Sequence, residues 1–129
     1  MTPSATARQW AWEFSYPGEK VTSTEMYVPV NTPVKVLLKT PIGDVIHAFY
    51  LPDLRVKEDI IPGQETYVWF QAEREGTYDI FCAEYCGKDH SKMRSFLHVV
   101  SSEGYRAWVK KQIAKRYKPL VFEGVKDPK

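Results

Sequence analysis

Four side chains of types that bind metals lie within twelve residues of the chain. The segment CAEYCGKDHSKM contains both cysteines of the sequence, Cys82 and Cys86, together with His90 and Met93. A disulfide between the cysteines would close a very small loop, so it would restrict the unfolded chain little and stabilise the fold little. It would also leave the histidine and the methionine without a role. A metal site therefore accounts for more of the segment.

The mixture of ligand types distinguishes between metals. Structural zinc sites use Cys and His and have little use for a thioether, whereas thiolate, imidazole and thioether together are the ligands of electron-transfer copper sites. A mononuclear blue-copper site needs one cysteine, so the second would be a surplus, reactive thiol. Two copper ions bridged by Cys82 and Cys86 remove that surplus. His90 and a second histidine would then cap the two ions, with Met93 and a backbone carbonyl as weak axial ligands.

The second histidine has to be His47 or His98, the two others in the sequence. His98 lies in an alternating segment where Leu97 and Val99 occupy the opposite face, which predicts a surface position. His47 lies in the apolar stretch GDVIHAFYLP, where an imidazole needs a partner. An isolated histidine in such a setting is usually a core residue with satisfied hydrogen bonds. Because the ligand count is one short, we expect His47 to be a copper ligand supplied from a distant strand.

The elements that position these residues are predicted to be mainly strands. The chain has 129 residues, enough for one domain with its own core, and proline and glycine interrupt it at short intervals. Four segments are rich in β-branched and aromatic residues or alternate in polarity: residues 32–40, 65–72, 76–82 and 92–100. Strands at this spacing are typical of a Greek-key β-sandwich or barrel.

The last part of the chain is predicted to be an amphipathic helix. An N-cap is available in Ser101–Glu103, and apolar residues then recur at helical spacing: Tyr105, Trp108, Val109, Ile113 and Tyr117. Beyond residue 100 the chain has 8 Lys+Arg against 3 Asp+Glu, whereas residues 1–100 have 10 against 13. A solvated helix face accounts for this basic excess. A nucleic-acid interface would need the cations on the folded body, so that function is disfavoured.

These residues resemble a known family, the CuA domain of subunit II of heme-copper cytochrome c oxidases. The family's Cys-x-Glu-x-Cys-Gly-x-x-His-x-x-Met loop is complete from Cys82 to Met93. The blocks DVIHAFYLP and KEDIIPG match its upstream segments, and QWAWEFSYP matches its aromatic block. The resemblance covers roughly residues 9–116. The sequence departs from the family at non-ligand positions: Ala11, Phe14 and Ala48.

The resemblance implies an all-β, cupredoxin-like fold with a C-terminal α-helix, and a binuclear copper centre. Its ligands would be His47, Cys82, the Glu84 main-chain carbonyl, Cys86, His90 and Met93. Electrons would enter at Trp10 from a cytochrome c type donor and pass to heme in the core subunit. In the full complex, a magnesium ion would lie near Glu84. The implied location is the periplasm or the outer face of the respiratory membrane, with the native protein anchored in that membrane.

The expected organisation has three parts. Residues 1–8 are expected to be a tail that follows a removed membrane anchor, residues 9–117 the copper domain with its helix, and residues 118–129 a tail or the start of a linker. No run of apolar residues is long enough to cross a bilayer and no signal-peptide core is present. In a full-length protein such a linker could lead into a cytochrome domain, which the sequence leaves open.

Other functions remain open on the sequence alone. A copper delivery or storage protein would hold labile Cu(I), a mononuclear copper electron carrier would bind one ion, and a structural zinc module would be colourless. No Ser/His/Asp set or acid/base carboxylate pair is apparent, so the domain by itself is expected to show no turnover. A cytochrome partner would favour an acidic patch, with the candidates Glu13, Glu19, Glu25 and Asp44.

Overall fold

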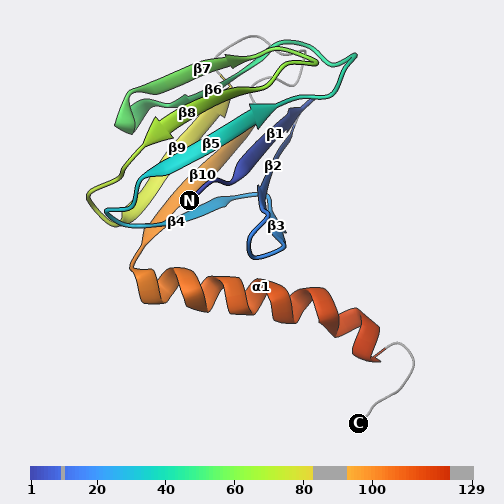
Figure 1. Ribbon diagram of the computed structural model, residues 1–129, viewed down its shortest axis with the longest axis vertical. Helices are drawn as coiled ribbons and strands as arrows, with labels where there is room; N and C mark the ends of the chain where they lie inside the picture. Colours follow the sequence, from blue (N-terminus) through green and yellow to red (C-terminus); the bar gives the residue numbers. More distant parts are fainter. Residues whose placement is uncertain (10, 83–92, 123–129) are drawn as a thin grey trace.

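Two five-stranded sheets pack face to face, and a long helix runs past one end of them (Figure 1). The computed structural model describes residues 1–9, 11–82 and 93–122, and for 116–122 it describes the backbone alone. The strand order is β3-β2-β1-β5-β8 in the first sheet and β4-β10-β9-β6-β7 in the second. The elements within these ranges are β1 (Ser4–Arg8), β2 (Ala11–Tyr16), β3 (Val21–Ser23), β4 (Met26–Pro29), β5 (Val34–Lys39), β6 (His47–Leu51), the short 3-10 helix η1 (Pro52–Leu54), β7 (Val56–Ile60), β8 (Thr66–Phe70), β9 (Gly76–Cys82), β10 (Arg94–Val100) and α1 (Ser102–Phe122).

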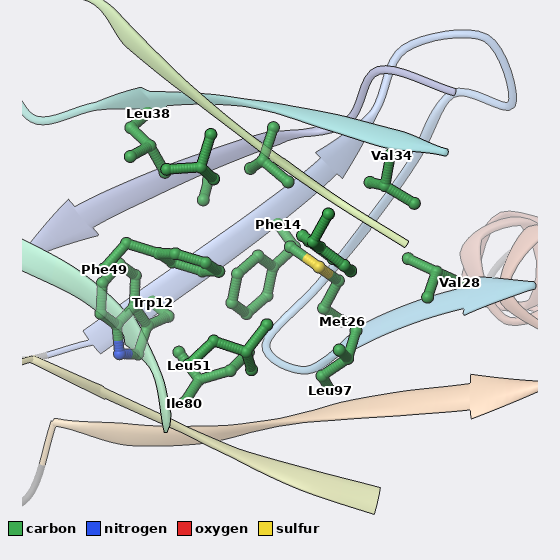
Figure 2. Packing of buried hydrophobic residues seen from close by; sticks show 14 of the residues in the cluster. Trp12, Phe14, Met26, Val28, Val34, Leu38, Phe49, Leu51, Ile80 and Leu97 are labelled. Carbon is green, nitrogen blue, oxygen red and sulfur yellow. The ribbon is translucent and has the colours of Figure 1, made fainter. Parts of the chain in front are cut away.

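Alternation of side chains along the strands creates the core between the sheets. Figure 2 shows Trp12 and Phe14 from β2 facing Phe49 and Leu51 from β6, with further aliphatic residues from β4, β5, β9 and β10 around them. The Trp12 ring meets the Phe49 ring edge-on, with 5.8 Å between centroids. Complete burial of each large side chain contributes about 1.5–3 kcal/mol, so this packing fixes how the two sheets sit on each other.

Register brings the ends of three strands together at one end of the sandwich. Phe49 of β6 is opposite Cys82 of β9, and Phe81 of β9 is opposite Arg94 of β10. The first residue of β6, the last of β9 and the residue before β10 are therefore neighbours. Three of the predicted ligands, His47, Cys82 and Met93, occupy those positions.

The predicted fold class is confirmed: the chain is a β-sandwich with a C-terminal helix. The four predicted strand segments correspond to β5, β8, β9 and β10. The predicted helix begins at Ser102, after an N-cap in which the Ser101 hydroxyl accepts the Gly104 N–H at 3.0 Å. The part of the chain that the structure describes has no helix of the length and apolar character that crossing a membrane requires.

The structure differs from the expected boundaries at both ends. Residues 1–8 were expected to be a tail, but β1 pairs antiparallel with β2 and parallel with β5, and Ala5 and Ala7 are fully buried. In the pairing of β1 with β2, these two alanines are opposite the rings of Phe14 and Trp12. The strand is therefore buried although its sequence is not strongly hydrophobic. At the other end, α1 continues to Phe122, into the segment expected to be a tail or linker.

The helix is held to the sandwich by stacked aromatic rings. Trp108 of α1 lies on Tyr27 of β4 with 4.4 Å between ring centroids, and Tyr27 stacks on its other side against His98 at 4.4 Å. His98 also contacts Glu25 through Nε2 at 2.5 Å and Thr77 through Nδ1 at 3.1 Å. A surface position was predicted for His98; its side chain is half-buried, and these contacts account for both ring nitrogens.

Tyr16 connects the two sheets through a buried hydroxyl. The hydroxyl donates to the Tyr27 carbonyl at 3.0 Å and accepts the Tyr27 N–H at 2.6 Å. Burial is the main reason that the pKa of Tyr16 lies far above its ordinary value of 10.0. A phenol that stays protonated in the folded state contributes its full stability below the unfolded pKa, and that contribution is lost as the pH rises beyond it.

We therefore expect the free energy of unfolding to fall above about pH 10, by up to about 1.4 kcal/mol per pH unit from this group. Tyr16→Phe should remove that part of the slope, and at neutral pH it should cost about 1–3 kcal/mol because the Tyr27 backbone groups lose their partner. Urea unfolding between neutral and alkaline pH measures both effects, with the exposed Tyr67→Phe as control. An unchanged alkaline slope in Tyr16→Phe would contradict the expectation.

Candidate metal centre

His47 provides a buried imidazole at the first position of β6. Its side chain is completely inaccessible to solvent. Nδ1 lies 3.8 Å from Cys82 Sγ, and Nε2 lies 3.0 Å from Asp44 Oδ1. An ionised carboxylate can only accept hydrogen bonds, so His47 Nε2 carries the ring hydrogen and donates a hydrogen bond to Asp44 Oδ1. The lone pair of the neutral ring is then on Nδ1, directed at the cysteine sulfur.

Cys82 and Met93 flank the segment 83–92 at the same end of the sandwich. Both side chains are buried in the core cluster. The Cys82 N–H donates to the Met93 carbonyl at 3.4 Å, which continues the pairing of β9 with β10 by one more hydrogen bond. A thiol and a thioether are thus supplied from adjacent strand ends, and the thiol lies next to the His47 imidazole.

Asp44 is fixed by three hydrogen bonds. Oδ1 accepts the Val45 N–H at 2.8 Å as well as the His47 ring N–H, and Oδ2 accepts the Gln9 N–H at 3.3 Å. Burial raises the pKa of the Asp44 carboxyl, but these hydrogen bonds lower it more, so the pKa lies below its ordinary value. The carboxylate is therefore ionised at neutral pH and holds the imidazole in one orientation.

The contacts with Asp44 and Cys82 also shift the pKa of the His47 imidazole. Burial lowers the pKa of His47, whereas hydrogen bonds and charge interactions with Cys82 and Asp44 raise it, and the net direction is upward. The Asp44 carboxylate, which accepts the Nε2–H, gives the imidazole more electron density than a lone buried histidine would have. In metalloproteins, a carboxylate on the distal nitrogen raises the basicity of a ligating histidine in this way.

Sequence reasoning did not identify Asp44 as the partner of His47. It considered Asp44 only as part of an acidic surface. The spacing of three residues in DVIH was the available signal, because a turn before a strand can bring side chains that far apart into contact. The loop makes such a turn, with the Asp44 N–H donating to the Pro41 carbonyl at 3.1 Å.

The other predicted site residues lie outside the described residues: Trp10, Glu84, Cys86 and His90. Within the described ranges, no three His, Cys, Asp or Glu side chains gather closely enough to hold a metal ion. The described part supplies one imidazole, one thiol and one thioether. That donor set fits copper, because soft sulfur ligands combined with imidazole are typical of copper electron-transfer sites and a thioether is not used by structural zinc.

Comparison with known proteins identifies the family. The sequence model described as cytochrome c oxidase subunit II, periplasmic domain, matches residues 20–100. The chain belongs to this family. It is 42% identical over 101 residues to cytochrome c oxidase subunit 2 of Synechocystis, covering 78% of this chain and 30% of that protein. It is 32% identical over 136 residues to an alternative cytochrome c oxidase subunit 2 of Bradyrhizobium diazoefficiens, covering 81% and 48%.

Solved structures of this family have the same fold. The periplasmic domain of subunit II of cytochrome oxidase (CoxB) from Bradyrhizobium japonicum superposes with a TM-score of 0.83 at 36% identity, covering 89% of this chain and 94% of that one. Subunit II in a mixed disulfide with the thioredoxin-like protein TlpAs gives a TM-score of 0.78 at 35% identity, covering 89% and 92%.

These comparisons confirm several predictions from the sequence. The protein is a cupredoxin-like domain of the subunit II family, and that family is periplasmic. This chain spans 30% and 48% of the length of the Synechocystis and Bradyrhizobium subunits. It corresponds to their periplasmic part.

Proposed function

We propose that this domain transfers electrons through a binuclear copper centre. The proposed ligands are His47, Cys82, the Glu84 main-chain carbonyl, Cys86, His90 and Met93. The observation that supports it best is the buried contact between His47 Nδ1 and Cys82 Sγ, with the opposite ring nitrogen bound to Asp44. Copper held by these residues would supply one-electron redox chemistry, and two ions would share the accompanying change in geometry.

The residues of the chain have distinct tasks in this proposal. His47 and Cys82 lie in strands β6 and β9, Met93 directly precedes β10, and the burial of all three side chains excludes water from that side of the site. A rigid, dry ligand set reorganises little when an electron arrives, which favours rapid transfer. Asp44 orients His47 and keeps its Nδ1 lone pair available to a metal. No bond of a substrate is made or broken.

The partners are proposed from the family. Electrons would come from a cytochrome c type donor, enter at Trp10 and leave to heme in the core subunit of a heme-copper oxidase. A magnesium ion near Glu84 in the full complex remains a prediction. The mixed disulfide formed by the relative from the TlpAs complex suggests a practical requirement: both Cys82 and Cys86 must be reduced before copper can bind.

The test is an electron paramagnetic resonance spectrum of the reduced-thiol protein after copper loading and oxidation, with copper measured per chain. We expect two coppers per chain and hyperfine splitting by two equivalent copper nuclei. Splitting by one nucleus would indicate a mononuclear carrier instead. Failure to retain oxidised copper would favour a delivery or storage protein, and a colourless protein that prefers zinc would favour a structural zinc module.

A further inference from the structure

The outer face of the first sheet carries a row of side chains that crosses all five strands. From β8 to β3, the paired residues of this row are Tyr67, Leu37, Ser4, Ser15 and Thr22. Each has a core residue next to it in its strand, so all five side chains point away from the core. Neighbouring strands are about 4.8 Å apart, which makes the row about 19 Å long. Along it, an aromatic and an aliphatic side chain give way to three hydroxyls.

Helix α1 borders this face without covering it. The helix packs on β3, β4 and β10 and runs past the end of the sheets, while β1, β5 and β8 lie side by side away from it (Figure 1).

The hydroxyl half of the row lies in a hollow of about 360 Å³. Five residues that line the hollow carry hydroxyls: Ser4, Thr6, Ser15, Thr22 and Thr40. The Thr40 hydroxyl is used within the fold, because it donates to the Ala7 carbonyl at 2.5 Å. The other four hydroxyls have no hydrogen-bond partner among the described residues. They are therefore available to a ligand.

Ser4 lies at the floor of the hollow. It is only 7% exposed, and its hydroxyl makes no hydrogen bond within the part of the chain that the structure describes. A buried hydroxyl without a partner is destabilising, and native proteins have few of them. A ligand oxygen or amide in the hollow would supply the missing partner.

The other half of the row adjoins two exposed aromatic rings. Tyr67 and Trp69 of β8 are 47% and 64% exposed. The Lys35 ammonium lies 4.1 Å from the centroid of the Tyr67 ring and 5.4 Å from that of the Trp69 ring. These cation–π contacts favour one arrangement of the two rings. Rings fixed at the surface form a platform on which the apolar face of a sugar ring can stack.

The charged residues of this face have a positive excess. Within the five strands they are Arg8, Lys35 and Lys39 against Glu13, and Glu65 just before β8 adds a second anion. Arg8 and Glu13 are 3.9 Å apart and both are more than half exposed, so their ion pair is weak. Arg8 and Lys39 line the hollow, where they can pair with a carboxylate.

The arrangement of these residues favours a glycan over a protein partner. Protein interfaces have an apolar centre and are depleted in Ser and Lys. Here the hydroxyls of Ser4 and Ser15 occupy the middle of the row, and the aromatic rings lie at one side. A polysaccharide presents both apolar ring faces and hydroxyls, and a row about 19 Å long accommodates several sugar units.

We propose that this face binds a polysaccharide whose sugar rings carry carboxylate groups. One sugar stacks on Tyr67 and Trp69, the next sugars hydrogen-bond Ser4 and the hydroxyls beside it, and carboxylates pair with Arg8 and Lys39. The family of this chain is periplasmic, and the periplasm contains a wall polymer of this chemical class. The proposal is independent of copper, because the face includes none of the proposed metal ligands.

Binding is tested by nuclear magnetic resonance on the copper-free, isotope-labelled chain. The probe is a soluble oligomer of alternating N-acetylglucosamine and N-acetylmuramic acid, whose lactyl groups carry carboxylates. A neutral N-acetylglucosamine oligomer of the same length is the control ligand. With the probe, we expect saturable shifts of the amide signals of residues 4–8, 13–15, 35–39 and 67–69. The neutral oligomer should bind about tenfold more weakly, because it forms no charge-assisted hydrogen bonds with the cations.

Four outcomes of this titration would overturn the proposal. The first is the absence of saturable shifts. The second is equal affinity for the neutral oligomer, which would exclude recognition of carboxylates. The third is a set of shifts confined to α1, whose lysines attract any polyanion. The fourth is the same set of shifts on concentrating the chain alone, which would identify a second copy as the occupant.

Two serine variants separate binding from stability. Ser4→Ala removes a hydroxyl that has no partner in the described fold, so the unfolding temperature should not fall, whereas affinity for the probe should fall about fivefold. Ser95→Ala is the matched control, because the buried Ser95 hydroxyl on β10 donates to the Thr24 carbonyl at 2.7 Å. It should lower the unfolding temperature by about 4 °C and leave the affinity unchanged. Equal affinities in the two variants would overturn the proposal.

A third variant tests the aromatic platform. Trp69→Ala should lower affinity for the probe about five- to tenfold, because a stacking surface is lost. Ile61→Ala truncates an exposed side chain in the loop between β7 and β8, outside this face, and should bind like the unmodified chain. Unchanged affinity in Trp69→Ala would contradict stacking of a sugar ring and overturn the proposal.

Discussion

Replacing Cys82 by serine is expected to abolish the paired copper centre. Cys82 Sγ lies 3.8 Å from His47 Nδ1 in a buried setting, so its thiolate is placed to bind the same metal as the imidazole. A serine hydroxyl remains protonated at neutral pH and is a poor bridging ligand for copper. The variant should bind at most one copper per chain and lose the splitting by two equivalent nuclei. Copper analysis and electron paramagnetic resonance measure both.

A control is needed because a buried hydroxyl can disturb the fold by itself. A buried hydroxyl without a well-placed partner costs about 1–3 kcal/mol, and thermal unfolding of the copper-free variant measures the actual cost at position 82. Val28→Thr introduces the same group at a fully buried position of β4, with nearly the same volume. We expect Val28→Thr to be destabilised to a similar degree and still to bind two coppers. A paired-copper spectrum in Cys82→Ser would contradict the proposed role of this cysteine.

The main features of the fold could be predicted because they depend on patterns that are local in sequence. Alternation of polarity and closely spaced turn residues indicate strands, and β5, β8, β9 and β10 lie where this signal is strong. Helix α1 was predictable for the same reason, from its N-cap at Ser101 and from the helical spacing of its apolar residues. His47 could be singled out because an imidazole in an apolar stretch needs a partner, and the structure shows it buried between Asp44 and Cys82; its role as a copper ligand stays a prediction.

The features that were missed depend on contacts between distant parts of the chain or on the exact path of a loop. Strand β1 is buried through Ala5 and Ala7, whose small side chains give little hydrophobic signal and fit only because large rings lie opposite. The role of Asp44 depends on a turn that includes Gly43, with a φ of +96° that favours glycine. An acidic residue in a loop is normally solvated, so the sequence alone favours the wrong environment for it.

The interaction of Asp44 with His47 leads to the other large expected effect. Asp44→Asn keeps the size of the side chain but removes the negative charge that binds the His47 ring N–H. Loss of a carboxylate on the distal nitrogen of a ligating histidine typically weakens metal binding about 10–100-fold. We expect a decrease of that size in copper affinity, measured by competition with a chelator, and a changed hyperfine splitting of the copper that remains.

A matched control and a second measurement distinguish positioning of the ligand from a general effect of charge. Asp79→Asn makes the same substitution at an exposed ion pair with Arg94, 2.6 Å away, so it should leave copper affinity unchanged. In the copper-free protein, the pKa of His47 should fall in Asp44→Asn, because Asp44 is among the partners that raise it. The imidazole resonances report that pKa directly. Equal copper affinities in the two variants, or an unchanged His47 titration, would show that Asp44 is a solvated loop residue and that the orientation of His47 depends on Cys82 and strand β6 alone.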